Sequence, residues 1–170
     1  SPRAKVLSID DKGSGQLMTI GQTLYAEGEK LIEMESRLFF RGESKGDKAP
    51  AAPPPAKPKA DRTFELTTAQ DLPKRYAVVS GDDNPIHLDE NLAKSVGFKG
   101  VILHGLSTLA LVVGKMPKPM TRLEVRFNKP VYPGEVLTTS LWNKGDLLEF
   151  ETTNAAGEIV LANGKAVAKL

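Results

Sequence analysis

The chain has 170 residues, 40% of them apolar and 26% charged, so it can bury a core and is not expected to be disordered. Its 23 basic and 21 acidic residues nearly cancel to a net charge of +2, which gives no electrostatic case for nucleic acid. The chain lacks cysteine, which excludes disulfides and thiolate chemistry and fits a reducing compartment. No apolar run approaches the ~20 residues of a membrane span, so no membrane partner is expected.

Residues 1–41 are predicted to form three strands. Two glycine-containing turns, at 12–15 and 27–30, separate the strands and favour a meander. The apolar spacing over 31–41 also admits a helix, but the flanking turns favour a strand. Three strands without a helix make an incomplete module, because one face of the sheet has nothing to pack against.

Residues 42–61 are predicted to be a linker rich in proline, alanine and lysine. Five of the chain's 12 prolines lie between positions 50 and 58. Such a stretch favours extended, solvated polyproline geometry. A spacer is the favoured interpretation, and binding to a proline-recognition partner is the alternative.

Residues 62–170 are predicted to form a complete domain. A short strand at 62–67 precedes a helix that Thr67 or Thr68 could cap and whose start Pro73 would delay. A short helix over 91–96 follows, and Gly97 can end it. The stretch 101–114 is apolar nearly all round, which predicts a helix buried on every side.

Four further strands are expected after that helix. They cover 122–131, 134–144, 146–154 and 158–170, with turn residues between them. A long buried helix followed by an antiparallel sheet that wraps it is the hot-dog arrangement. The sequence therefore predicts an α+β hot-dog fold, with a partial second hot-dog repeat at the N-terminus.

An acid and a base lie close together in the stretch Tyr76–Ala93. Asp82 and His87 flank a turn that contains Asn84 and a proline, and they suit general acid–base chemistry. The alternative is a simple Asx-type turn with a hydrogen-bonded loop histidine. A metal site formed with Asp89 and His104 is not expected, since the spacing matches no common zinc or iron pattern.

This stretch closely resembles the (R)-specific enoyl-CoA hydratase motif of the MaoC-like hot-dog family. The segments ILHGLSTLA and RFNKPVYPGE are similar to the family's central helix and substrate-lining strand. The remainder is similar to two-repeat hydratases 2 of peroxisomal multifunctional enzymes, with 1–41 as the end of a first repeat whose leading half is missing. The motif positions are filled by Tyr76, Ser80, Gly81, Asp82, Asn84, Pro85, Ile86, His87 and Ala93.

The resemblance implies reversible hydration of trans-2-enoyl-CoA to (3R)-3-hydroxyacyl-CoA in fatty-acid β-oxidation. Asp82 and His87 would share one water, and the sequence leaves open which of them donates the proton. Asn84 would bind this water or a catalytic side chain, or only form the turn. The backbone N–H of Gly105, at a helix start, would stabilise the thioester oxygen.

Further site residues follow from the same resemblance. The expected substrate contacts add Asp83, Pro85, Ile86 and Phe127, although Asp83 fits a solvated charge and Phe127 a core position. Ser80 could bond to Asp82, and His104 is expected to hold the turn through a ring hydrogen bond. The CoA phosphates have several candidate partners: Lys94, Lys99, Arg122, Arg126 and Lys129.

The remaining expectations concern partners and location. No dissociable cofactor is expected, because CoA is part of the substrate, and a homodimer is expected because hot-dog sheets generally pair edge to edge. The alternatives are a non-catalytic subunit that binds acyl-CoA or scaffolds a complex, and a dehydratase acting in reverse or on a carrier-protein thioester. Ala168-Lys169-Leu170 resembles a peroxisomal address, with the cytoplasm as the alternative.

Overall fold

The chain divides into two compact units, Ser1–Pro55 and Ala56–Leu170. The structure is a computed structural model that describes residues 2–42, 57–116 and 119–168. The centre of the expected linker, 43–56, lies outside the described residues, as do the last two residues of the C-terminal tripeptide.

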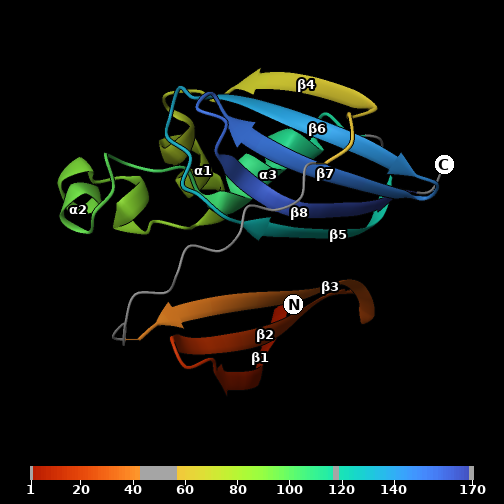
Figure 1. Ribbon diagram of the computed structural model, residues 1–170. Coiled ribbons are helices and arrows are strands. Elements are labelled where there is room, and N and C mark those ends of the chain that lie inside the picture. Colours follow the sequence, from red (N-terminus) through yellow and green to blue (C-terminus); the bar gives the residue numbers. More distant parts are fainter. Residues whose placement is uncertain (1, 43–56, 117–118, 169–170) are drawn as a thin grey trace. The chain divides into compact units, whose positions relative to one another are not determined.

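The N-terminal unit is a three-stranded antiparallel sheet in the order β1-β2-β3 (Figure 1). Its strands are β1 (Pro2–Asp11), β2 (Gly15–Ala26) and β3 (Glu29–Arg41), so the expected strands are present and the helical alternative for 31–41 is wrong. Gly13 and Gly28 take φ values of 74° and 87° in the two turns, which side chains disfavour.

Large apolar side chains on all three strands of this unit are exposed. No helix lies among the described residues of the unit, so one face of the sheet has no layer of its own to pack against. The assignment of this sheet to an incomplete repeat stays a prediction. The exposed side chains are Val6, Leu7, Ile9, Leu24, Leu31, Ile32, Met34, Leu38, Phe39 and Phe40.

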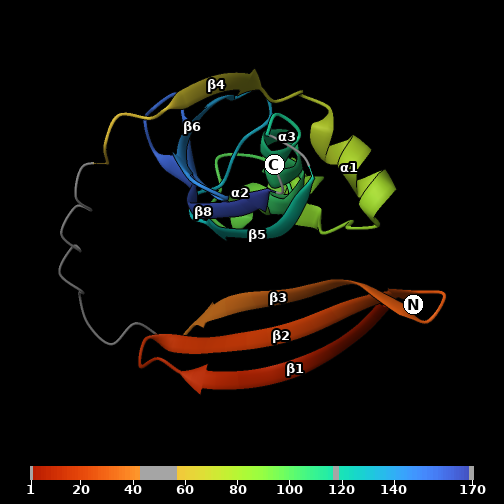
Figure 2. The ribbon, with the colours of Figure 1, turned by 90° about the vertical axis from the view of Figure 1, so that its right-hand side faces the viewer.

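The C-terminal unit is a five-stranded antiparallel sheet that curves around the helix α3, with α1 and α2 at one end (Figures 1 and 2). The strand order is β4-β6-β7-β8-β5. The expected α+β hot-dog arrangement is confirmed. Its elements are β4 (Arg62–Thr67), α1 (Leu72–Ser80), the 3-10 turn η1 (Pro85–His87), α2 (Glu90–Ser95), α3 (Gly105–Val113), β5 (Met120–Phe127), β6 (Val136–Lys144), β7 (Leu147–Asn154) and β8 (Ile159–Ala168).

The core of this unit lies between α3 and the concave face of the sheet. Alternate residues of β6 and β7 are buried, as expected where one face of a strand packs inward. Thr139 and Thr152 are buried on neighbouring strands and satisfy each other through a 2.9 Å hydroxyl hydrogen bond. The buried cluster is Leu103, Val112, Met116, Val131, Leu137, Leu141, Leu148, Phe150, Val160, Leu161 and Ala166.

The helix expected over 101–114 begins only at Gly105. The two residues before His104 bond elsewhere: Ile102 N–H donates to the carbonyl of Ile86 at 3.3 Å, and Leu103 N–H to that of Val131 at 2.8 Å. These tertiary bonds hold the segment in non-helical form. The helix is also not buried on every side, because the sheet covers one side only.

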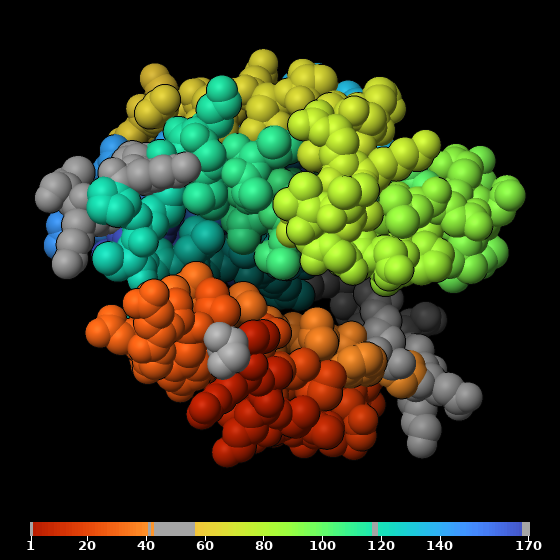
Figure 3. All heavy atoms as spheres, turned by 180° about the vertical axis from the view of Figure 1, so that it is seen from behind, coloured from red at the N-terminus to blue at the C-terminus, as the bar shows by residue number. Residues whose placement is uncertain are grey.

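The exposed side of α3 lies next to α1 in the space-filling view (Figure 3). Leu106, on the first turn of α3, is 55% exposed. The helix α1 starts late, at Leu72 with Pro73 in its first turn, as expected, but its N-cap is Asp71 and not Thr67 or Thr68. The hydroxyl of Thr68 donates instead to the carbonyl of Glu135 at 3.2 Å. Within the ranges described, no helix is long and apolar enough to cross a membrane.

Candidate active site

Three hydrogen bonds hold Asp82 in the loop after α1, two to nearby residues and one from His104. Gly81, with φ of 73°, ends α1 and turns the chain into the loop. The Asp82 N–H donates to Ser80 Oγ at 3.2 Å, and the Asn84 N–H donates to Asp82 Oδ1 at 3.3 Å. The third bond reaches the Asp82 carbonyl from His104 Nε2 at 2.9 Å. The exposed carboxylate of Asp82 therefore has a defined position, because both its main chain and one carboxylate oxygen are hydrogen-bonded.

Asn84 connects this loop to the turn that carries His87. Its side-chain oxygen accepts the N–H of Ile86 at 3.3 Å and so caps the 3-10 turn η1. His87 ends this turn and is only 8% exposed. The turn-forming role considered for Asn84 is therefore present in the structure, and it leaves the NH2 group of the amide free of this bond.

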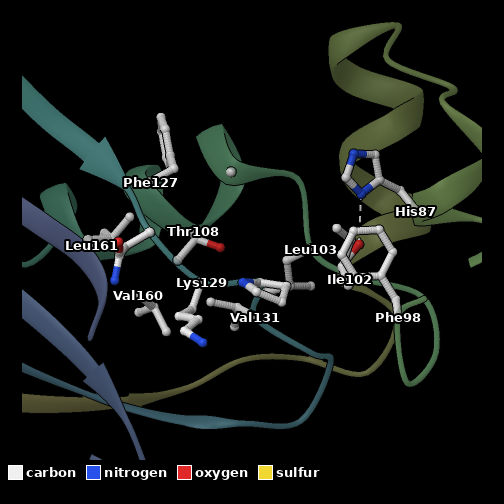
Figure 4. Close-up of a pocket in the computed structure, with 13 residues that line it drawn as sticks. His87, Phe98, Ile102, Leu103, Thr108, Phe127, Lys129, Val131, Val160 and Leu161 are labelled. Carbon is white, nitrogen blue, oxygen red and sulfur yellow. Dashed lines mark hydrogen bonds between the residues drawn. The ribbon is translucent and has the colours of Figure 1, made fainter. Parts of the chain in front are cut away.

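The ring of His87 has one defined tautomer. Its Nδ1 lies 2.8 Å from the carbonyl oxygen of Ile102 (Figure 4). Because a carbonyl only accepts, Nδ1 carries the hydrogen and Nε2 keeps a lone pair. Burial lowers the pKa of His87 below its ordinary 6.5, and repulsion by His104 lowers it further, against the raising effects of the Ile102 carbonyl and Asp82. His87 is thus a neutral base near pH 7.

His104 lies against His87 at the start of α3. The two rings stack with centroids 3.8 Å apart and planes 28° apart, and the ring of Tyr76 lies 4.9 Å from His104. A carboxylate oxygen of Asp82 and one ring nitrogen each of His87 and His104 all lie within 4.8 Å of one another. The fold therefore brings the expected acid and base together.

The same three residues are a poor set of metal ligands. One nitrogen of each ring is already used in a bond to a carbonyl. The two remaining ring nitrogens belong to rings that pack face to face, with centroids 3.8 Å apart. The buried Nδ1 of His104 is also closed to solvent.

Gly105 presents a backbone donor at the first position of α3. The N–H of a first helical residue has no acceptor within its own helix, and the helix dipole makes this end positive. A Cβ built on Gly105 would lie 3.0 Å from a ring carbon of Phe127. Glycine therefore allows the Phe127 ring and a ligand to approach the backbone closely.

A largely apolar cavity of about 300 Å³ lies beside these residues (Figure 4). Of the expected site residues, His87, Gly105 and Phe127 line it, together with Lys129 from the candidate phosphate partners. A few polar groups on apolar walls are typical of a small-molecule pocket. The remaining lining residues are Phe98, Ile102, Leu103, Thr108, Asn128, Pro130, Val131, Val160 and Leu161.

The other expected contacts lie on the loop and not in the cavity wall. Asp82, Asp83, Asn84 and Pro85 are exposed, and Ile86 is half-buried. Thr108 was missed by the sequence interpretation, although a polar residue one turn after Gly105 in an apolar run was a usable signal. The Ile102 carbonyl was also missed, because no side-chain pattern announces a backbone acceptor.

Three of the candidate phosphate partners are engaged in exposed ion pairs. Lys94 pairs with Glu90 at 3.0 Å, Lys129 with Glu158 at 3.8 Å, and Arg122 with Glu124. Exposed pairs of this kind are weak and exchange readily with solvent, so they do not remove any of the three residues from consideration.

Comparison with known proteins places the chain in a family. Residues 51–163 match the family described as MaoC like domain. Peroxisomal multifunctional enzyme type 2 of Drosophila melanogaster is 35% identical over 179 residues, covering 96% of this chain and 29% of that protein. A crystal structure of a MaoC-like dehydratase from Phytophthora capsici superposes with a TM-score of 0.85 at 31% identity, covering 99% of this chain and 61% of that one.

The chain belongs to the MaoC-like domain family. A further relative is the probable enoyl-CoA hydratase 2 of Dictyostelium discoideum, 31% identical over 96% of this chain and 62% of that protein. The chain thus spans less than two thirds of the length of these curated relatives.

The lowered pKa of His87 predicts a pH-dependent stability. A histidine with a depressed folded-state pKa binds protons better when unfolded, so stability is complete above the unfolded value of 6.5 and falls as the pH drops below it. The slope contributed by this residue is at most about 1.4 kcal/mol per pH unit. Urea unfolding between pH 5 and 7.5 measures it.

His87→Asn is the matched variant for this prediction. The Asn side-chain N–H can still donate to the Ile102 carbonyl, but the group does not titrate. We expect a shallower decline in the unfolding free energy than in the wild type. Equal declines in the two proteins would contradict the prediction.

Proposed function

We propose that the chain catalyses reversible hydration of trans-2-enoyl-CoA to (3R)-3-hydroxyacyl-CoA, a step of fatty-acid β-oxidation. The observation that carries the proposal is the pairing of Asp82 with a His87 whose Nε2 is free, at the edge of an apolar cavity that also contains the start of α3. The name of the relative from Dictyostelium, a probable enoyl-CoA hydratase 2, supports the same chemistry.

The reaction needs one water held between acid and base. The water oxygen bonds to C3 of the enoyl group as its proton passes to the lone pair of His87 Nε2. The C2–C3 π electrons move toward the thioester, and C2 takes a proton from the Asp82–His87 pair. The pair then ends the turnover with the same number of protons as at its start. The proposed 3R alcohol forms because the site presents only one face of C3 to the water.

Gly105 and Asn84 have supporting roles in this proposal. Negative charge develops on the thioester oxygen as C3 is attacked, and the free N–H of Gly105 at the positive end of α3 is suited to receive it. Asn84 uses its oxygen in the turn, so its NH2 group is the part available to orient the water. No dissociable cofactor is required, because CoA enters as part of the substrate.

The proposal predicts a hydratase that depends on both members of the pair. Mixing the protein with crotonyl-CoA or a longer enoyl-CoA should remove the conjugated enoyl absorbance. Asp82→Asn and His87→Asn should each lower kcat by about 10²- to 10⁴-fold, because each removes one half of the proton transfer. An enzyme specific for the 3R alcohol, coupled to the assay, checks the product.

Asp146→Asn serves as the matched control. Asp146 is an exposed carboxylate in the turn between β6 and β7, so its variant should keep the wild-type rate. A folded wild type that binds CoA thioesters but leaves the absorbance unchanged would favour the non-catalytic subunit. Activity only on carrier-protein thioesters would change the assigned substrate but leave the assigned catalytic residues unchanged.

We also propose that the chain forms a homodimer. Val78 and Val79 on α1 are 87% and 86% exposed, and β4 and β5 are the open edges of the five-stranded sheet. Buried together in an interface, such apolar side chains and unpaired edges would be stabilised. Light scattering coupled to size-exclusion chromatography should give twice the chain mass, and a concentration-independent monomer would refute the dimer.

A peroxisomal location is proposed from the relatives, several of which carry that word in their names. The tripeptide Ala168-Lys169-Leu170 is the candidate signal. A fluorescent protein fused ahead of this chain should enter peroxisomes, and removal of the tripeptide should leave it in the cytoplasm. Import that survives the removal would assign targeting to another segment.

A further inference from the structure

Resting on the hydratase function proposed above, we propose that His104 is a positioning residue, which holds Asp82 and His87 in register through one hydrogen bond and one ring stack. His104 is buried and is drawn from the segment before α3, and it touches both members of the pair. It transfers no proton itself in this role.

The hydrogen bond from His104 ties two distant parts of the chain. Its Nε2 lies 2.9 Å from the carbonyl oxygen of Asp82, 22 positions earlier in the sequence. Since the carbonyl only accepts, Nε2 carries the hydrogen. The next residue is Gly105, so this bond fixes the distance between the loop that carries the carboxylate and the N–H proposed for the thioester oxygen.

The ring stack fixes the second member. With its Nδ1 bonded to Ile102 and one face against His104, the ring of His87 is restrained in rotation about its side-chain bonds. The charged and titratable groups that face His87 are His104 and Asp82, which lower and raise its pKa respectively. His104 therefore influences the base as well as the placement of the acid.

The second ring nitrogen of His104, Nδ1, makes no contribution to holding the site. Its Nδ1 is buried and is the one such side-chain atom without a hydrogen-bond partner among the described residues. An unpartnered buried nitrogen costs stability. A phenyl ring would avoid that cost and keep the stack, but it would lose the bond to Asp82, so the imidazole is explained by the donor.

Two variants separate the donor from the ring. His104→Phe keeps a flat ring and removes the donor, while His104→Gln keeps an N–H at a similar reach and removes the ring. We expect His104→Phe to lower kcat about tenfold to a hundredfold with little change in KM. Without the bond from His104, the carboxylate of Asp82 moves slightly relative to His87 and the substrate, and small misplacements of a reacting group are costly. His104→Gln should recover most of this loss.

The split between kcat and KM gives a readout that a merely structural role would not produce. A general loss of packing would change kcat and KM together, whereas misplacement of the carboxylate lowers kcat alone. Equal losses of kcat in the two variants, a parallel rise in KM, or a wild-type rate in His104→Phe would overturn the proposal.

Nitrogen NMR of the wild type tests the geometry without an activity assay. The chain has 2 histidines, so both ring signals can be assigned by one substitution. The proposal requires the hydrogen on Nδ1 of His87 and on Nε2 of His104, and a hydrogen on Nδ1 of His104 would refute it even if His104→Phe does not fold. A wild type with these tautomers but no hydratase activity would refute the proposed function and not the arrangement.

Discussion

The site depends on one hydrogen bond, from the ring of His104 to the carbonyl of Asp82. The loop that carries Asp82 is exposed and would otherwise be held only by local bonds from Ser80 and Asn84, which set its shape but not its position. The bond anchors that shape to the first turn of α3. Because α3 packs into the concave sheet, the position of an exposed carboxylate is set by the hydrophobic core.

The base is anchored to the same core by a different route. His87 bonds to the carbonyl of Ile102, and the N–H of Ile102 returns to the carbonyl of Ile86. One residue further, Leu103 is bonded to Val131 and buried in the central cluster. Acid and base therefore both depend on the three residues that precede α3, which explains why this segment is extended and not helical.

The sequence predicted the parts of the site that rest on local chemistry. The turn residues Asp82 and Asn84 are recognisable because each side chain accepts a backbone N–H two positions further along the chain. The apolar pattern alone placed the start of α3 too early and gave no sign of the Ile102 acceptor, since backbone pairing between distant segments leaves no trace in residue type. Only the family resemblance placed Gly105 at a helix start, where the structure has it. The apolar run over 101–114 was similarly ambiguous, because hydrophobicity does not say how many sides of a helix the sheet covers.

The close packing of Phe127 on Gly105 links the mutational histories of these two positions. Even a methyl group at 105 would meet the aromatic ring at 3.0 Å, so the ring must move before any larger residue is accepted. A smaller residue at 127 would in turn remove a wall of the cavity. A substitution at either position alone therefore disturbs the packing or the cavity, and substitutions at the two positions are expected to occur together among related sequences.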